Sequence, residues 1–147
     1  MDLGQVFNIF NEIGIINQLS TSMLAKALPN GVHPSHFAIV NHLFRVGDGT
    51  TPIRIAGAMQ VTKTTMTHSL KVLMDHGFIE TRPNPEDARG KLVFLTDHGR
   101  DFRNAAIQTV AEMFGSIFDQ NQLDAMAALT PGLVALRKHL DANRPGD

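Results

Sequence analysis

The sequence contains no cysteine, and it also lacks the marks of a secreted or membrane protein. Disulfides, thiolate zinc sites, iron–sulfur clusters and thiol redox switches are therefore excluded. The N-terminal residues lack a basic stretch followed by an apolar run and a small-residue cleavage site, and no apolar run reaches the length of a membrane span. We therefore expect a cytoplasmic protein with no membrane partner.

Sequence motifs of common enzyme classes are absent too. The chain has no HExxH motif, no GxSxG motif and no phosphate-binding GxxxxGK(S/T) loop. His33 and His36 are three residues apart and His42 follows, but no Cys, Asp or Glu joins them locally to complete a metal-ligand set. We expect these histidines to cap a helix, to add a polar group to a pocket or to lie at the surface. The sequence predicts no enzyme, no metal site and no cofactor.

Charged residues are unevenly distributed along the chain. Apolar residues make up 43% and charged residues 18%, which is typical of folded globular proteins. The formal net charge is −1, but basic residues outnumber acidic ones over residues 52–103, and the segments on either side are net negative. This distribution permits binding to nucleic acid without demonstrating it.

The N-terminal segment predicts a long helix. Apolar residues recur at three- and four-residue steps over residues 6–28. Their apolar surface is wider than contact with one core requires, which indicates a second contact, with another subunit. We expect a dimerisation helix over about residues 4–28.

The C-terminal segment predicts helices over about residues 97–141, which we also assign to dimerisation. Thr96 can cap the first of them, and Asp119 with Gln122 forms a capping-box pattern that opens the last. Pro131 is expected to interrupt that last helix, because proline lacks a backbone donor.

The middle of the chain predicts three shorter helices and a β-hairpin. The expected helices cover residues 34–46, 52–59 and 63–76. Their expected inward residues include Ile53, Ala56 and Met59 in the second helix and Met66, Leu70, Leu73 and Met74 in the third. Two strand-forming runs, at 78–82 and 91–95, are separated by PNPEDARG, which is dense in turn formers. We expect a hairpin with a long polar tip.

This order of helix, tight turn, helix and hairpin is typical of a winged helix-turn-helix. The second helix of such a unit enters the DNA major groove, so its exposed face must offer short polar and cationic side chains. The helix from 63 onwards fits, with no acid before Asp75. The expected DNA-contacting residues here are Thr62, Lys63, Thr64, Thr65, Thr67, His68 and Lys71.

The hairpin supplies further candidates for DNA contacts. Arg89 lies two residues after Asp87, whose carboxylate can hold the guanidinium in a bidentate pair and aim it outward. An arginine held at a wing tip suits a narrow minor groove. Arg82 and Lys91 are the other expected DNA contacts of the wing.

Two alternative interpretations stay open at this point. The polar face of the helix can be simply solvated, with Asp87 and Arg89 forming an ordinary surface ion pair. Winged helices also serve as protein-interaction modules that do not bind specific DNA. The absence of acidic residues between Lys63 and Lys71 favours DNA.

The run LMDHGFIETRPNPEDARGKLVFLTDHGRD resembles the wing signature of the MarR family of bacterial regulators. The matching residues are Leu73, Gly77, Phe78, Ile79, Arg82, Asp87, Arg89, Leu95, Thr96 and Gly99, with Val61, Thr62, Lys63, Thr64 and Thr65 resembling the start of the recognition helix. Three positions depart from the pattern. Ala88 replaces a common arginine, Gln60 stands where the turn often has glycine, and Pro131 lies inside the last helix.

The resemblance covers nearly the whole chain and implies a single MarR-like domain over residues 1–147. Its fold is expected to be mainly α with a small β-hairpin wing, with the winged helix-turn-helix at about 34–96. The family implies a homodimer on a pseudo-palindromic operator in double-stranded DNA, usually as a repressor. It also implies response to a small aromatic or phenolic effector. The residues expected to line an effector pocket are Phe10, Ile13, His36, Phe37 and Phe102.

Overall fold

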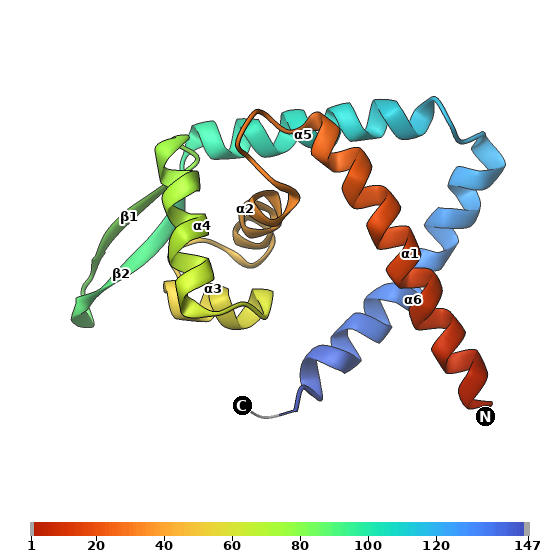
Figure 1. Ribbon diagram of the computed structural model, residues 1–147, viewed down its shortest axis with the longest axis horizontal. Helices are drawn as coiled ribbons and strands as arrows, with labels where there is room; N and C mark the ends of the chain where they lie inside the picture. Colours follow the sequence, from red (N-terminus) through yellow and green to blue (C-terminus); the bar gives the residue numbers. More distant parts are fainter. Residues whose placement is uncertain (1, 146–147) are drawn as a thin grey trace. The chain divides into compact units, whose positions relative to one another are not determined.

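The computed structural model describes residues 2–145. By its internal contacts the chain divides after Val110 into two compact units. The elements are α1 (Leu3–Ala27), α2 (Pro34–Val46), α3 (Pro52–Met59), α4 (Lys63–Asp75), β1 (Ile79–Asn84), β2 (Asp87–Leu95), α5 (Asp97–Gly115) and α6 (Gln120–Ala142) (Figure 1). The expected fold class, mainly α with one antiparallel hairpin, is confirmed.

The helices of the first unit begin where local hydrogen bonding favours a start. The Thr51 hydroxyl accepts a hydrogen bond from the backbone N–H of Arg54 at 3.3 Å, and Pro52 occupies the first helical position. The Thr62 hydroxyl likewise accepts from the N–H of Thr65 at 3.1 Å. Each cap satisfies a backbone donor that the first helical turn leaves without a partner.

The turn between α3 and α4 keeps a glycine-like geometry without glycine. Gln60 has φ 57° and ψ 41°, in the left-handed region, and its N–H donates to the carbonyls of Ala56 and Gly57. Val61 N–H also donates to the Ala56 carbonyl, at 3.1 Å. The departure at Gln60 therefore leaves the tight turn intact.

One apolar core joins α2, α3, α4 and the hairpin. Its buried residues are Val32, Ile39, Val40, Leu43, Ile55, Ala56, Met66, Leu70, Leu73, Phe78, Ile79, Val93 and Leu95. Two residues that were predicted to face the core do not do so. Ile53 is 65% exposed because the first turn of α3 turns it outward and Ile55 takes its place, and Met74 is 40% exposed at the last turn of α4.

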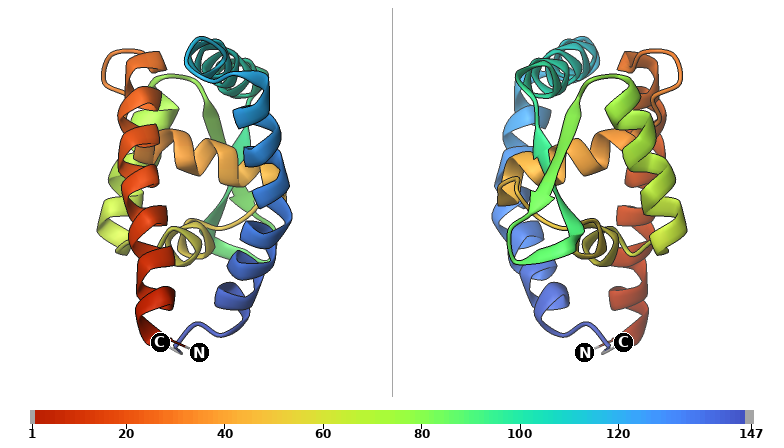
Figure 2. Two further views of the ribbon diagram at one scale, coloured as in Figure 1. Left: turned by 90° about the vertical axis from the view of Figure 1, so that its right-hand side faces the viewer. Right: turned by 90° about the vertical axis from the view of Figure 1, so that its left-hand side faces the viewer.

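The hairpin projects beside α4, and β2 also packs against α2 and α3 (Figures 1 and 2). Its register pairs Ile79 with Leu95 and continues to Pro83 opposite Lys91, after which a bulge shifts the pairing. The predicted long tip was wrong, because the strands extend into the turn-forming residues and leave only Pro85 and Glu86 as the turn.

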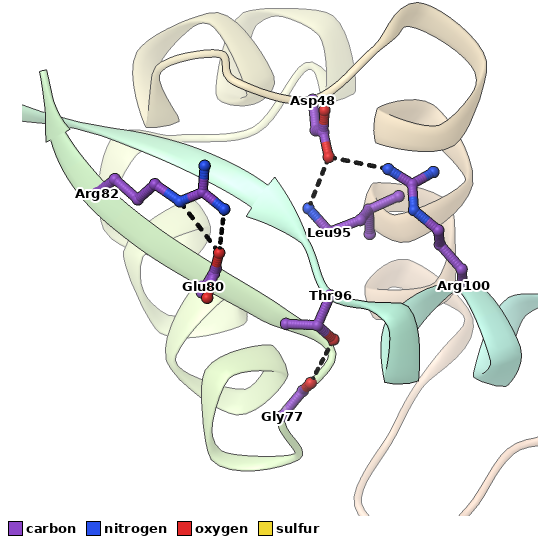
Figure 3. Close-up of polar contacts among 7 residues, drawn as sticks. All are labelled: Asp48, Gly77, Glu80, Arg82, Leu95, Thr96 and Arg100. Atoms are coloured by element: carbon purple, nitrogen blue, oxygen red, sulfur yellow. Dashed lines mark hydrogen bonds and ion pairs between the residues drawn. The ribbon is translucent and has the colours of Figure 1, made fainter.

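Polar contacts at the base of the hairpin attach it to the helices on either side (Figure 3). The carboxylate of Asp48 accepts from the N–H of Leu95 at 3.1 Å and from the guanidinium of Arg100, also at 3.1 Å. The Thr96 hydroxyl donates to the carbonyl of Gly77 at 2.6 Å. The loop before α3, the end of β2 and the start of α5 are thereby held together.

The second unit contains the last residues of α5 and the whole of α6. Asp119 and Gln122 form the capping box predicted from the sequence, with both hydrogen bonds at 2.9 Å. Pro131 does not divide the last helix as expected, because α6 continues through it from Gln120 to Ala142. None of the helices in the described part of the chain is both long enough and apolar enough to span a membrane.

Candidate nucleic-acid interface

The start of α4 presents two linked threonine hydroxyls. Thr62 accepts the N–H of Thr65 and donates its own hydroxyl proton to the Thr65 hydroxyl, 2.9 Å away. This pairing fixes the Thr62 side chain and leaves the hydroxyl of Thr65 with a proton to donate. Both side chains are exposed. The first turn of α4 therefore offers an oriented donor to a partner.

The exposed face of α4 carries the other residues predicted for DNA contact. A shallow hollow of about 430 Å³ is lined by Lys63, Thr64, Thr67, His68 and Lys71. Thr67 donates to the carbonyl of Lys63 at 2.9 Å, and Lys71 pairs with Asp75 at 2.8 Å. Because both side chains of that pair are more than 60% exposed, the interaction is weak and a phosphate can replace the carboxylate.

The wing tip differs in one respect from the sequence prediction. The Asp87 carboxylate accepts the backbone N–H of Arg89 at 3.0 Å rather than pairing with its guanidinium. A short Asx-type turn satisfies the carboxylate locally, so Asp87 positions the backbone of the tip. Within residues 2–145, the side chains of Lys63, Arg89 and Lys91 form no ion pair. Their charges are open to a phosphate partner.

Arg82 is held against the hairpin. Its Nε donates to the Glu80 carboxylate at 3.1 Å (Figure 3). Its guanidinium lies 4.1 Å from the centre of the Phe94 ring. The i, i+2 spacing of Glu80 and Arg82 places both on one face of β1. A DNA contact by Arg82 stays a prediction, and its charge is already partly compensated.

His33 and His36 form a helix cap, which is one of the three roles that the sequence left open for them. The backbone N–H of His33 donates to Nδ1 of His36 at 2.9 Å. Burial, together with repulsion from His33, His68 and His76, lowers the pKa of His36 below 6.5. The pKa of His42 is also lowered, by burial and then by Arg45. In the described part of the chain, no group of three or more His, Cys, Asp or Glu side chains is arranged so that it could hold a metal ion.

The predicted effector pocket stays a prediction. The structure brings Phe37 and Phe102 together, with ring centres 6.1 Å apart in an edge-on arrangement. Phe102 also stacks on Phe78 at 4.0 Å. His36, in the first turn of α2, is buried, whereas Phe10 on α1 is 43% exposed.

Two features of the interface were missed from the sequence. Arg54 is an exposed cation on α3, and with Asn84 and Glu86 it lines a hollow of about 310 Å³ between α3 and the hairpin tip. Asp48 and Arg100 pair across 52 residues of sequence. No local pattern marks either feature, because each depends on how distant segments pack.

Together these elements define a winged helix-turn-helix protein. The family model of the MarR family matches residues 30–90. The multiple antibiotic resistance protein MarR of Salmonella typhimurium is 31% identical over 100 residues, which is 63% of this chain and 69% of that protein. The Escherichia coli protein of the same name is 30% identical over the same shares of the two chains. This chain belongs to the MarR family of transcription regulators.

Solved structures share the fold. The apo form of E. coli MarR superposes with a TM-score of 0.69 at 22% identity, covering 90% of this chain and 97% of that one. A mutant of E. coli MarR complexed with operator DNA gives 0.63 at 22% identity, with coverage of 90% and 99%. A regulator from Pseudomonas aeruginosa gives 0.75 at 18% identity, with coverage of 93% and 95%.

Proposed function

We propose that this chain is a sequence-specific DNA-binding repressor in which α4 reads the major groove and the β1–β2 hairpin lies along the adjacent minor groove. The observation that carries the proposal is the exposed, acid-free face of α4 from Lys63 to Lys71, beside a wing whose Arg89 has no ion-pair partner within residues 2–145. Cations supply affinity through the phosphates, and hydroxyl and imidazole groups discriminate bases.

Each proposed contact has one of two roles. Lys63, Lys71, Arg89 and Lys91 contact phosphates or the minor groove, with Arg82 as a further contact. Thr62, Thr64, Thr65, Thr67 and His68 meet base edges and nearby phosphates. A threonine methyl can contact thymine, and a threonine hydroxyl can bond to either type of base pair. Asp87 positions Arg89 through its backbone.

The terminal helices support a homodimer. No residue of α1 or α6 is buried in this chain. The large apolar side chains that they expose are Leu3, Phe7, Ile9, Phe10, Ile15, Ile16, Leu19, Met126, Leu129, Leu133, Val134 and Leu140. So many exposed apolar residues at helical spacing are typical of a protein interface. We propose that the chain acts as one functional domain whose terminal helices bind a second copy.

A symmetric dimer has consequences for the DNA site and for control. Two α4 helices read a pseudo-palindrome when their centres are about one DNA turn, ~34 Å, apart. A small aromatic or phenolic effector that prefers another separation lowers operator affinity by its differential binding to the two states. Phe10, Ile13, His36, Phe37 and Phe102 are the proposed effector contacts.

A genomic-fragment selection with purified protein, followed by binding isotherms at several salt concentrations, tests the proposal. We expect an enriched inverted repeat, bound by a dimer with an affinity that falls steeply with salt. Lys138→Ala removes a cation of α6 and serves as the matched control for changes on α4 and the wing. Binding that is absent or indifferent to sequence would favour the alternative, a protein-interaction module.

A further inference from the structure

Five histidines gather where α2, α4, the hairpin and α5 meet. His33 and His36 belong to the start of α2, and their ring centres are 5.4 Å apart. His76 at the end of α4 stacks on Phe78 at 5.3 Å, and His98 at the start of α5 lies 5.0 Å from the same ring. The fifth, His68, lies on α4 and acts electrostatically on His36. The proposed DNA contacts use only His68.

The geometry at His36 requires a neutral ring. Its Nδ1 accepts the N–H of His33, so that nitrogen carries no proton. Only 6% of the residue is exposed. A proton added at Nδ1 would set two donors against each other, break the cap of α2 and leave a charge in a buried position.

Among residues 2–145, no carboxylate acts on His36 to compensate such a charge. The charged groups that act on His36 are His33 next to its own helix and His68 and His76 from α4, and each of them lowers the pKa of His36 further. On the α5 side, His98 lies against the Phe78 ring. A proton on His36 would therefore place an uncompensated positive charge at the contact between α2 and α4.

We propose that this histidine cluster is a proton-sensitive joint, through which acidification loosens α4 from α2 and releases operator DNA. The inference rests on the DNA-binding function proposed above and names the proton as an effector of it. α2 buries His36, Ile39, Val40 and Leu43 in the unit whose core also holds Met66, Leu70 and Leu73 of α4. Loosening the first turn of α2 therefore weakens the support behind the reading helix.

The direction in which pH changes the folding stability follows from the linkage between protonation and folding. The pKa of His36 is lowered in the folded protein, so the unfolded or loosened chain binds more protons. The contribution of His36 to stability is complete above the ordinary value of 6.5 and is lost as the pH falls through the lowered pKa.

His36→Gln tests the contribution of His36. Glutamine at the third position of a helix accepts the capping N–H, as in a capping box, but does not titrate. His42→Gln is the matched control, because His42 is also partly buried on α2 with a lowered pKa but is influenced by Arg45 rather than by α4. We would measure urea unfolding and affinity for the selected operator at about pH 7.5 and about pH 5.5, on either side of the ordinary histidine pKa.

We expect all three proteins to bind alike at the higher pH. On acidification, the wild type and His42→Gln should lose about fivefold or more in affinity relative to His36→Gln. His36→Gln should also lose less folding stability than the wild type. Equal pH dependence of wild type and His36→Gln, when both bind at the higher pH, would overturn the proton-sensitive joint alone. No specific binding by the wild type at the higher pH would overturn the DNA-binding function, and this inference with it.

Discussion

Gly99→Ala tests the close approach of α5 to the backbone of Phe78. Gly99 lies in the first turn of α5, and a Cβ at this position would stand 2.0 Å from the carbonyl oxygen of Phe78. Real contacts of this kind need at least ~3 Å, so α5 would have to move away by about an ångström. That movement would strain two hydrogen bonds of Thr96, from its N–H to the Phe78 carbonyl at 3.1 Å and from its hydroxyl to the Gly77 carbonyl at 2.6 Å.

The expected loss adds two effects. Overpacking a tight contact costs about 1–3 kcal/mol, and each weakened hydrogen bond costs about 1 kcal/mol. We therefore expect the free energy of unfolding to fall by about 3–5 kcal/mol, a large part of the stability of a typical domain. The Phe78–Phe102 stack, with ring centres 4.0 Å apart, would be displaced as well.

Urea unfolding followed by far-ultraviolet circular dichroism measures this loss, since the chain has no tryptophan or tyrosine to report by fluorescence. Gly57→Ala is the matched control, because its Cβ would meet nothing within 4 Å on helix α3. The control should raise stability by about 0.5–1 kcal/mol. A Gly99→Ala protein that unfolds within about 1 kcal/mol of the wild type would refute the close approach of α5 to Phe78.

Three further substitutions have defined outcomes. Arg89→Ala should weaken binding to every DNA sequence and reduce the slope of log affinity against log salt by about one; an unchanged slope would contradict the wing contact. Asp48→Ala should lower the free energy of unfolding by about 1–3 kcal/mol, because the Leu95 N–H loses its acceptor; the half-exposed Arg100 pair adds little. Gln60→Gly should raise the free energy of unfolding by up to about 1 kcal/mol by relieving a left-handed residue, and a loss in the same urea assay would argue against that turn geometry.

Much of the helical structure was predictable from the sequence because its signals are local. Thr51, Thr62 and Asp119 each accept a backbone N–H three residues ahead. Those bonds depend on residue type and spacing alone. The fold class and family could be predicted for the same reason, since the order of elements and the wing pattern are contained in one stretch of chain.

Predictions that depended on fine geometry were less successful. Pro131 was expected to interrupt α6, yet one lost backbone donor does not end a helix whose other bonds remain. The wing tip was expected to be long. Instead, most of the turn-forming residues are β-strand residues of the hairpin. The Asp87 carboxylate accepts a hydrogen bond from the backbone N–H of Arg89, two residues away, instead of pairing with the Arg89 guanidinium.

The sequence by itself determined where the helices start and which face of α4 is polar. Only the tertiary structure decided that Ile55 rather than Ile53 enters the core, that Asp48 meets Arg100, and that His36 is buried among histidines of another helix. The physical reason is range. A cap or an amphipathic stripe is decided within one or two turns of chain, whereas burial and ion pairing between segments dozens of residues apart depend on how whole elements pack.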